Sequence, residues 1–304
     1  MTKNTAKLNN MQKILDAAKA YPALPVAVVD AGETHVLKGI MEAQQAGLVE
    51  PLLIGQETRI HAVAKKIGMT LEGREIIPAI SDADASRIGI ELVKQKKVFA
   101  LAKGWIHTDT LMHAVLTQLQ TTQRISHVFI AELESYHKLL FITDAAININ
   151  PDLMTKAAII ENAVYLARLL GIETPKVAAL SAVEVVKPAI ASTVDAANLS
   201  VMARRGQIKN AIVDGPLAFD NAISKEAARV KKIDSVVSGD VDILLAPDLD
   251  AANILAKELE YLAGATMPGI VVGAEVPVML SSRSDPAEAR LLAAALAVIM
   301  YHNK

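Results

Sequence analysis

The 304-residue sequence contains no cysteine. Without thiols the chain can form no disulfide scaffold, no thiolate metal site and no cysteine nucleophile. Aromatic residues make up only 3% of the chain, with a single tryptophan, so few side chains are available to stack on bases or sugars. The core must therefore be built mainly from alanine, valine, isoleucine and leucine.

The sequence also lacks an excess of charge of either sign. Its 31 lysines and arginines nearly balance its 33 aspartates and glutamates, which leaves a net charge of -2 at pH 7. Nucleic-acid-binding proteins usually show a strong basic excess, so we expect no nucleic-acid partner.

No hydrophobic run is long enough to cross a membrane. The longest covers residues 291–301, which is shorter than the span of about 20 residues that a membrane helix needs. The first 20 residues are polar and then amphipathic, without the apolar core and cleavage site of a secretory signal. We therefore expect a soluble, cytoplasmic protein with no membrane partner.

Hydrophobic residues make up 52% of the sequence and charged residues 21%, which excludes bulk disorder. The length is that of about two domains. Short β-branched runs alternate with longer amphipathic stretches, and this alternation predicts an α/β fold of two domains with largely parallel sheets. The predicted strands are 25–30, 51–54, 75–77, 97–102, 127–131, 138–143, 176–180, 210–214, 241–246, 269–272 and 276–280. The predicted helices are 34–46, 57–67, 82–96, 108–120, 151–170, 192–205, 218–229, 250–262 and 285–302.

Two further features of the sequence concern the pairing of two strands and the division into domains. Strands 127–131 and 138–143 are joined by a short polar link, which indicates a hairpin or an antiparallel insertion in the sheet. The turn-rich segment NINPD (148–152) opens a long helix, and we place the domain boundary there. The last helix is very apolar and is expected to return to the first domain. That domain would then comprise residues 1–150 plus 284–304, and the second domain residues 151–283.

The common local signatures of catalysis are absent. The sequence contains no GxG, no P-loop, no HExxH and no GxSxG. The positions of interest are therefore the carboxyl ends of strands, where open α/β sheets bind ligands.

The first such position follows strand 276–280. Arg283 can bind a phosphate through two parallel hydrogen bonds, Ser282 supplies a small hydroxyl, and a helix N-terminus follows. The alternative is a plain capped loop, in which Asp285 is the N-cap, Pro286 the first helical residue and Glu288 the partner in a capping box. Capping accounts for Asp285 and Glu288, whereas both interpretations remain open for Ser282 and Arg283.

The second position follows strand 97–102. Lys103 can serve as a point charge for phosphate, Gly104 allows a close backbone approach, and Thr108 or Asp109 can cap the next helix. The alternative is a strand end with a solvated lysine. We interpret His107 as structural or exposed.

The third position is Asp214, in Asp-Gly-Pro, where turn chemistry is the simpler interpretation. An aspartate at the carboxyl edge of a sheet can also line a cleft. Asp144, at the end of FITD, and Asn253, after APDLDAA, stand in the same topological position with the same two interpretations.

At these residues the chain resembles the phosphate acetyl/butyryl transferases. The segments that carry the resemblance are FITDAAININPD (141–152), VAALSAVEVVKPAIASTVDAANL (177–199), GQIKNAIVDGPLAFDNAIS (206–224), DILLAPDLDAANILAK (242–257) and VPVMLSSRSDPAEA (276–289). They match in order and with similar spacing from about residue 25 to the C-terminus. The residue patterns of SAVEVVKPA and DGPLAFDNA resemble the phosphate butyryltransferase branch more than the acetyl branch.

The resemblance implies an enzyme that interconverts acyl-CoA plus phosphate with acyl phosphate plus CoA. It implies two α/β domains with an interdomain cleft, similar to isocitrate and isopropylmalate dehydrogenases, and a homodimer or larger oligomer. Coenzyme A and phosphate are then substrates, and no cofactor or metal is expected. By the same resemblance Ser282 and Arg283 are the catalytic pair, and we expect Lys103, Gly104, Thr108, Asp144, Asp214 and Asn253 to bind substrate.

One position departs from the acetyl branch, which has an aspartate seven residues after the serine as the proposed base for the CoA thiol. Here that residue is Ala289. The base is therefore unassigned, and acyl specificity is left open among butyryl, branched-chain, acetyl and propionyl groups.

Two other functions compete with this interpretation. An NAD-dependent hydroxy-acid dehydrogenase of related architecture would need a nucleotide loop and a metal-binding cluster drawn from Asp214, Asp240, Asp242, Asp248 and Asp250. Most of these aspartates are interpreted as solvated turns. A non-catalytic CoA-binding protein is favoured only by Ala289.

Overall fold

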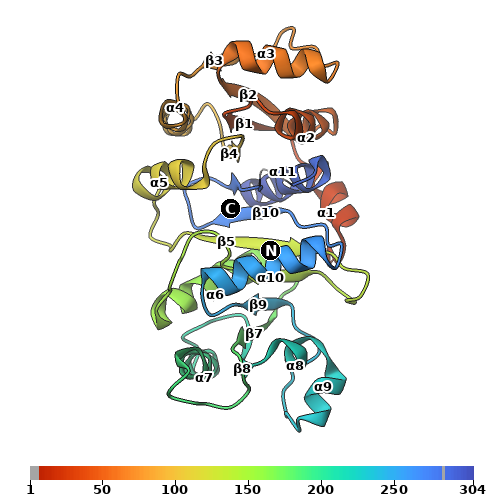
Figure 1. The fold of residues 1–304 in the computed structure, drawn as a ribbon, viewed down its shortest axis with the longest axis vertical. Coiled ribbons are helices and arrows are strands. Elements are labelled where there is room, and N and C mark those ends of the chain that lie inside the picture. The colour runs from red at the N-terminus through yellow and green to blue at the C-terminus, as the bar shows by residue number, and fades with distance from the viewer. Residues whose placement is uncertain (1–6, 283–284) are drawn as a thin grey trace. The chain divides into compact units, whose positions relative to one another are not determined.

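The computed structural model describes residues 7–282 and 285–304. This part of the chain forms two compact units, whose elements are labelled in Figure 1. The N-terminal unit comprises Met11–Ile125 and Pro268–Lys304, and the central unit comprises residues 7–10 and Ser126–Met267. Helices and strands alternate along the chain, so the predicted α/β class is confirmed.

The N-terminal unit has a sheet with the strand order β3-β2-β1-β4-β11-β10. Its strands run parallel except β10, which pairs antiparallel with β11. The strands are β1 (Leu24–Val29), β2 (Val49–Gly55), β3 (Ile76–Pro78), β4 (Ala100–Lys103), β10 (Gly269–Val272) and β11 (Val278–Met279). The helices are α1 (Met11–Ala18), α2 (Thr34–Gln45), α3 (Glu57–Lys66), α4 (Asp82–Lys94), α5 (Thr108–Gln118) and α11 (Ala287–His302).

Helices cover both faces of this sheet, with α4 and α5 on one side and α1, α2 and α11 on the other (Figure 1). Every residue of β4 and β10 is buried, as expected for strands that are covered on both faces. Helix α11 packs on α1 and α2, and its stretch from Leu292 to Met300 is buried without interruption. A helix that is apolar all round is stable only inside a core, which explains this placement.

The central unit has the strand order β5-β6-β9-β7-β8. Its strands are β5 (Ser126–Ala131), β6 (Leu140–Thr143), β7 (Lys176–Leu180), β8 (Ile212–Leu217) and β9 (Ile243–Leu245). Strand β5 pairs antiparallel with β6, which confirms the predicted antiparallel pair, and the other neighbours are parallel. The helices are α6 (Leu153–Leu169), α7 (Ala191–Arg204), α8 (Phe219–Ile223), α9 (Lys225–Val230) and α10 (Leu249–Tyr261).

The boundaries of the two units differ from the predicted domain boundaries, which were placed after residues 150 and 283. Residues 126–150 belong to the central unit because β6 pairs with β9, and residues 268–282 belong to the N-terminal unit because β11 pairs with β4. The turn-rich segment 148–152 opens a long helix, α6, as predicted, and Asp152 caps this helix by accepting a hydrogen bond from the Thr155 N–H at 2.7 Å.

Two predicted elements have other bounds in the structure. The single helix expected over 218–229 is divided into α8 and α9, because the Ser224 side chain caps α9 by accepting from the Ala227 N–H. Strand β8 continues through the Asp-Gly-Pro segment to Leu217, beyond the expected end at 214. Among residues 7–282 and 285–304, no helix has the length and hydropathy needed to span a membrane.

Candidate active site

Two of the predicted strand-end positions meet at one edge of the N-terminal unit. Strands β4 and β11 are parallel neighbours, with Leu101 opposite Val278 and Ala102 opposite Met279. Their carboxyl ends therefore bring Lys103 next to Ser281 and Ser282. Lys103 is only 3% exposed, and its Nζ lies 3.5 Å from the Ser281 carbonyl oxygen. The alternative of a solvated lysine is thus wrong, because Lys103 is buried beside the segment that carries Ser282.

Gly104 is required by a close approach of two backbone segments. Its N–H donates to the Val29 carbonyl at 2.8 Å, and the Trp105 N–H donates to the Asp30 carbonyl at 2.8 Å. A Cβ at position 104 would lie only 2.0 Å from the Asp30 carbonyl oxygen. The close approach at Gly104 is therefore one between β4 and the end of β1, and a backbone approach to phosphate stays a prediction.

Thr108 is the first residue of α5 and is half-buried. The N-cap position belongs to His107, whose side chain makes no capping hydrogen bond in the described part of the chain. The prediction that Thr108 or Asp109 caps α5 is therefore wrong, since both lie inside the helix.

The loop before α11 also differs from the predicted capping box. The N-cap position is Pro286, and no side chain of residues 7–282 or 285–304 caps α11. The Asp285 carboxylate instead accepts a hydrogen bond from the Ser282 N–H at 2.7 Å. Asp285 therefore holds the loop in which Ser282 lies. Arg283, the other member of the predicted catalytic pair, lies outside the described residues.

In the central unit, Asp144 and Asn253 come together at the carboxyl end of β6. The Asp144 carboxylate accepts hydrogen bonds from the N–H groups of Ala146, Ile147 and Asn148 and from the Asn148 side chain. The Asn253 side chain donates to the Ala145 carbonyl at 3.1 Å. Burial raises the pKa of the Asp144 carboxyl, and the hydrogen bonds that it accepts offset part of this rise.

Asp214 does not lie at a strand end. It is inside β8, opposite Ala178 of β7, and its carboxylate accepts a hydrogen bond from the Gly215 N–H at 2.9 Å. Pairing along β7 and β8 therefore overrides the turn chemistry of Asp-Gly-Pro.

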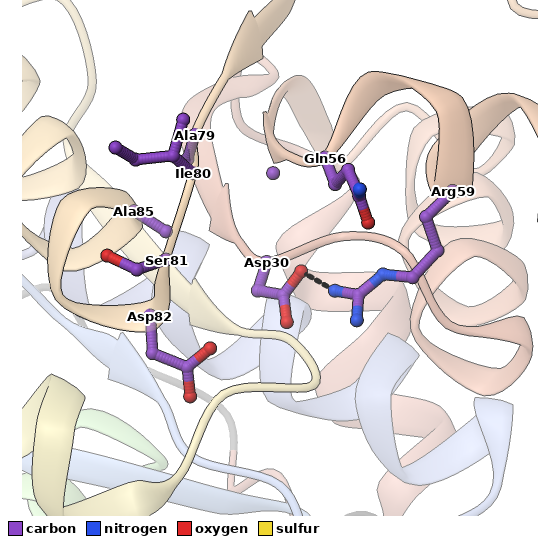
Figure 2. A pocket seen from close by; sticks show the side chains of 9 residues that line it. Asp30, Gln56, Arg59, Ala79, Ile80, Ser81, Asp82 and Ala85 are labelled. Atoms are coloured by element: carbon purple, nitrogen blue, oxygen red, sulfur yellow. Dashed lines mark hydrogen bonds and ion pairs between the residues drawn. The ribbon is translucent and has the colours of Figure 1, made fainter.

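A cavity that the sequence did not point to lies at the carboxyl edge of β1, β2 and β3 (Figure 2). Its volume is about 330 Å³. Asp30, with a φ of 61°, follows β1 and points its carboxylate toward the Arg59 guanidinium of α3, with which it forms an ion pair. Aspartate tolerates this left-handed conformation better than most residues. The lining residues are Asp30, Gly55, Gln56, Arg59, Ala79, Ile80, Ser81, Asp82 and Ala85.

A second unpredicted cluster lies in the central unit, where Lys156 of α6 pairs with Asp195 of α7 at 2.7 Å. The Lys156 side chain is 7% exposed. The hydroxyls of Ser181 and Ser192 lie 2.8 Å apart in the same region, which contains a small cavity lined by Lys156, Ser192 and Asp195. The segment SAVEVVKPAIASTVDAA contains Ser181, Ser192 and Asp195 and could have pointed to this cluster, but spacing alone does not show that its residues lie near Lys156.

The remaining acidic residues have structural partners. Asp240 pairs with Lys138 and Lys176, and Asp242 pairs with Lys138. Burial would raise the pKa of Asp240, but hydrogen bonds from Lys176, His137 and Lys138 hold it well below its usual range. Asp248 caps α10 by accepting from the Ala251 N–H. These contacts differ from the solvated turns that the sequence suggested for Asp240 and Asp242.

Comparison with known proteins decides the family. The family model described as "Phosphate acetyl/butaryl transferase" matches residues 75–298. The chain belongs to this family. A phosphate acetyltransferase of Rickettsia typhi is 46% identical over 95% of this chain and 84% of its own length. A phosphate butyryltransferase of Clostridium beijerinckii is 40% identical over 96% of this chain and 97% of its own length.

Solved structures agree with this assignment. A branched-chain phosphotransacylase from Enterococcus faecalis V583 aligns with a TM-score of 0.78 at 30% identity, covering 92% of this chain and 99% of its own. A 4-hydroxythreonine-4-phosphate dehydrogenase from Burkholderia phymatum aligns with a TM-score of 0.52 at 14% identity, covering 92% of this chain and 98% of its own. The second match shows the fold alone and confirms the predicted dehydrogenase-like architecture. Like its family, the protein is a phosphate acyltransferase.

Proposed function

We propose that this phosphate acyltransferase moves a short acyl group directly between CoA and phosphate at the edge where β4 and β11 end. The observation that carries the proposal is the meeting of Lys103 and the Ser281–Ser282 segment at this edge. A buried ammonium group beside a serine loop provides positive charge and hydrogen-bond donors, which an oxyanion or a phosphate needs.

In the proposed reaction a phosphate oxygen attacks the thioester carbonyl carbon. The tetrahedral intermediate then collapses, the C–S bond breaks, and CoA leaves as a thiolate that takes up a proton. A cysteine-linked acyl-enzyme is excluded because the chain has no cysteine. Most of the rate enhancement then comes from holding phosphate and thioester together in the right orientation.

Ser282 and Arg283 have separate roles in this scheme. The Ser282 N–H already donates to Asp285, so we assign the hydroxyl as the donor to the developing oxyanion. Arg283, together with Lys103, is proposed to hold the phosphate, since a guanidinium keeps its charge at every working pH.

The other predicted substrate-binding residues differ in what they contact in the structure. Gly104 lets β4 approach β1, and Thr108 begins the helix that follows. The Asp144 carboxylate holds the turn after β6, so we propose that its role is to fix this turn rather than to transfer a proton. Asn253 supports the same turn through Ala145. A substrate contact for Asp214 remains a prediction.

The proton acceptor for the CoA thiol is unassigned. Ala289, which replaces the aspartate of the acetyl branch, is buried in α11. Asp285 is held by Ser282, so neither position supplies an evident base.

The acyl group is proposed to be butyryl or branched-chain, with acetyl second. Relatives named for acetyl and butyryl transfer have similar identities, and one methylene in an apolar pocket changes binding by only about 1–3 kcal/mol. Several short acyl groups should therefore react. We further propose that CoA and phosphate act as substrates without a cofactor, that the protein is cytoplasmic, and that it forms a homodimer or larger homo-oligomer.

Two substitutions test the assigned roles. Ser282→Ala should lower kcat by about 100- to 1000-fold, the usual effect of removing one oxyanion donor. Arg283→Ala should raise the apparent KM for phosphate. Ser86→Ala and Arg87→Ala on α4 are matched controls, because Ser86 is buried with no hydrogen-bond partner among the described residues and Arg87 is exposed. Kinetics near those of the wild type in both test variants would exclude these roles.

A further inference from the structure

Arg290 is a buried cation that the sequence did not single out. It lies in the first turns of α11 and is 8% exposed. Its Nη2 donates to the Ser282 carbonyl at 2.8 Å, and its Nη1 lies 3.5 Å from the Lys103 carbonyl. One guanidinium therefore bridges the backbone of the β4 end and the loop after β11.

The same loop is held from its other side. The Ser282 N–H donates to the Asp285 carboxylate, while the Ser282 carbonyl accepts from Arg290. Both backbone groups of Ser282 thus bond to charged side chains, and such hydrogen bonds are about twice as strong as neutral ones. Rotation of the Ser282 peptide groups is restricted on both sides.

Helix α2 is shaped to receive the Arg290 side chain. A Cβ on Gly39 of α2 would lie 2.7 Å from the Arg290 Cβ and 2.9 Å from its Cδ. Val28, Val36 and Ile40 contribute apolar groups to a small cavity that Arg290 and Lys103 also line. The arginine stem therefore fills a space that only a glycine leaves open.

Burying a charge in this way is costly, and an apolar residue of similar volume would often be as stable. Burial lowers the pKa of Arg290, while the carboxylates of Asp285 and Glu33 act in the opposite direction. A guanidinium nevertheless remains charged in a protein. Packing alone does not require an arginine here, which points to a role for its donors.

We propose that Arg290 is a positioning residue for acyl transfer. By joining the Ser282 and Lys103 carbonyls it fixes the spacing between the Ser282 hydroxyl and the Lys103 ammonium group. It also keeps a positive charge behind the loop that faces the phosphate. This inference rests on the proposed function of Ser282 and Lys103.

The test compares Arg290→Met, Arg290→Lys and the control Arg74→Met. Methionine keeps much of the arginine stem but removes the charge and the donors. Arg74 lies just before β3, at the amino edge of the same parallel sheet, and donates to the Thr70 carbonyl and to the Gln44 side chain, so its substitution is the same chemical change at the opposite edge. Steady-state kinetics of CoA release are measured with phosphate and butyryl-CoA varied in turn, alongside thermal unfolding.

Arg290→Met should lower kcat/KM for phosphate by about 10- to 100-fold, in line with the loss of a charged hydrogen bond. The KM for butyryl-CoA should change less than twofold. Arg290→Lys should recover part of the loss, because an ammonium group keeps the charge but cannot bridge both carbonyls with a planar fork. Arg74→Met should match the wild type.

A purely structural role would lower the unfolding temperature and leave both KM values and kcat of the folded protein unchanged, and this result would overturn the inference. If Arg290→Met does not fold, Arg290→Lys decides, and wild-type kinetics for it would overturn the inference equally. If the wild type and Arg74→Met show no phosphate-dependent CoA release, the proposed function fails as well, and the two failures are thereby distinguished.

Discussion

Gly104→Ala tests whether the β1–β4 approach builds the site. The added Cβ would lie 2.0 Å from the Asp30 carbonyl oxygen and 2.5 Å from the Val29 carbonyl oxygen. Non-bonded heavy atoms are stable at about 3.5 Å or more, so the segments must separate by about 1–1.5 Å. Both obstacles are backbone atoms, which cannot turn aside as a side chain can.

The expected cost follows from the contacts that this separation breaks. The Gly104 N–H and the Trp105 N–H each donate to one of the two obstructing carbonyls. Losing two such bonds costs about 1 kcal/mol each, and overpacking adds about 1–3 kcal/mol. We therefore expect the free energy of unfolding to fall by about 3–5 kcal/mol, a large part of the usual total of about 5–15 kcal/mol.

The assay is urea unfolding followed by circular dichroism, together with phosphate-dependent CoA release. Gly47→Ala is the control, because Gly47 has a φ of 75° and a Cβ added there would meet nothing within 4 Å, so its alanine should cost only about 1–2 kcal/mol. The folded fraction of Gly104→Ala should also lose activity, because Lys103 moves with its neighbour. A loss of stability below about 1 kcal/mol with full activity would refute the reasoning.

Two further predictions concern charged groups outside the proposed site. Asp240→Asn should lower the free energy of unfolding at pH 7 by about 1–3 kcal/mol, since it weakens the hydrogen bonds to Lys138 and Lys176. The pKa of Asp240 in the folded protein lies below the unfolded value of about 3.9. The difference in unfolding free energy from the wild type should therefore be complete above that pH, begin to shrink as the pH falls below it, and disappear as the pH falls through the folded pKa. Urea unfolding at pH 7 and pH 3 checks this, because the loss has begun by pH 3, and an equal difference at both pH values would contradict it. Lys156→Met should lower the unfolding temperature, because Asp195 loses a charged hydrogen-bond partner in a part-buried pair, a loss of about 1–3 kcal/mol. An unchanged unfolding temperature by calorimetry would show that the pair is not needed.

Sequence periodicity predicted the alternation of strands and helices because burial on both faces leaves continuous apolar runs. It could not predict the strand order. Lys103 and Ser282 are far apart in the chain, and only the pairing of β4 with β11 brings them together. The sequence therefore showed Lys103 and Ser282 only as the ends of two separate strands, and not as parts of one site.

Local signals failed where tertiary contacts competed with them. Asp285 fits an N-cap by sequence, but its carboxylate bonds to the Ser282 N–H instead. Asp-Gly-Pro fits a turn, but pairing with β7 extends β8 through it. Arg290 lies in an apolar helix, where the sequence pattern gives no sign that a single charge matters. Its proposed role rests on Gly39 and on the carbonyls that face it, which only the structure shows.

The most direct test of acyl transfer is the stoichiometry of its two products. Purified protein is mixed with butyryl-CoA at several phosphate concentrations, free CoA is followed with a thiol reagent, and acyl phosphate is trapped with hydroxylamine. CoA release should rise to saturation with phosphate, and one acyl phosphate should form for each CoA. Release that does not depend on phosphate, or that yields free acid instead of acyl phosphate, would contradict direct attack of phosphate on the thioester.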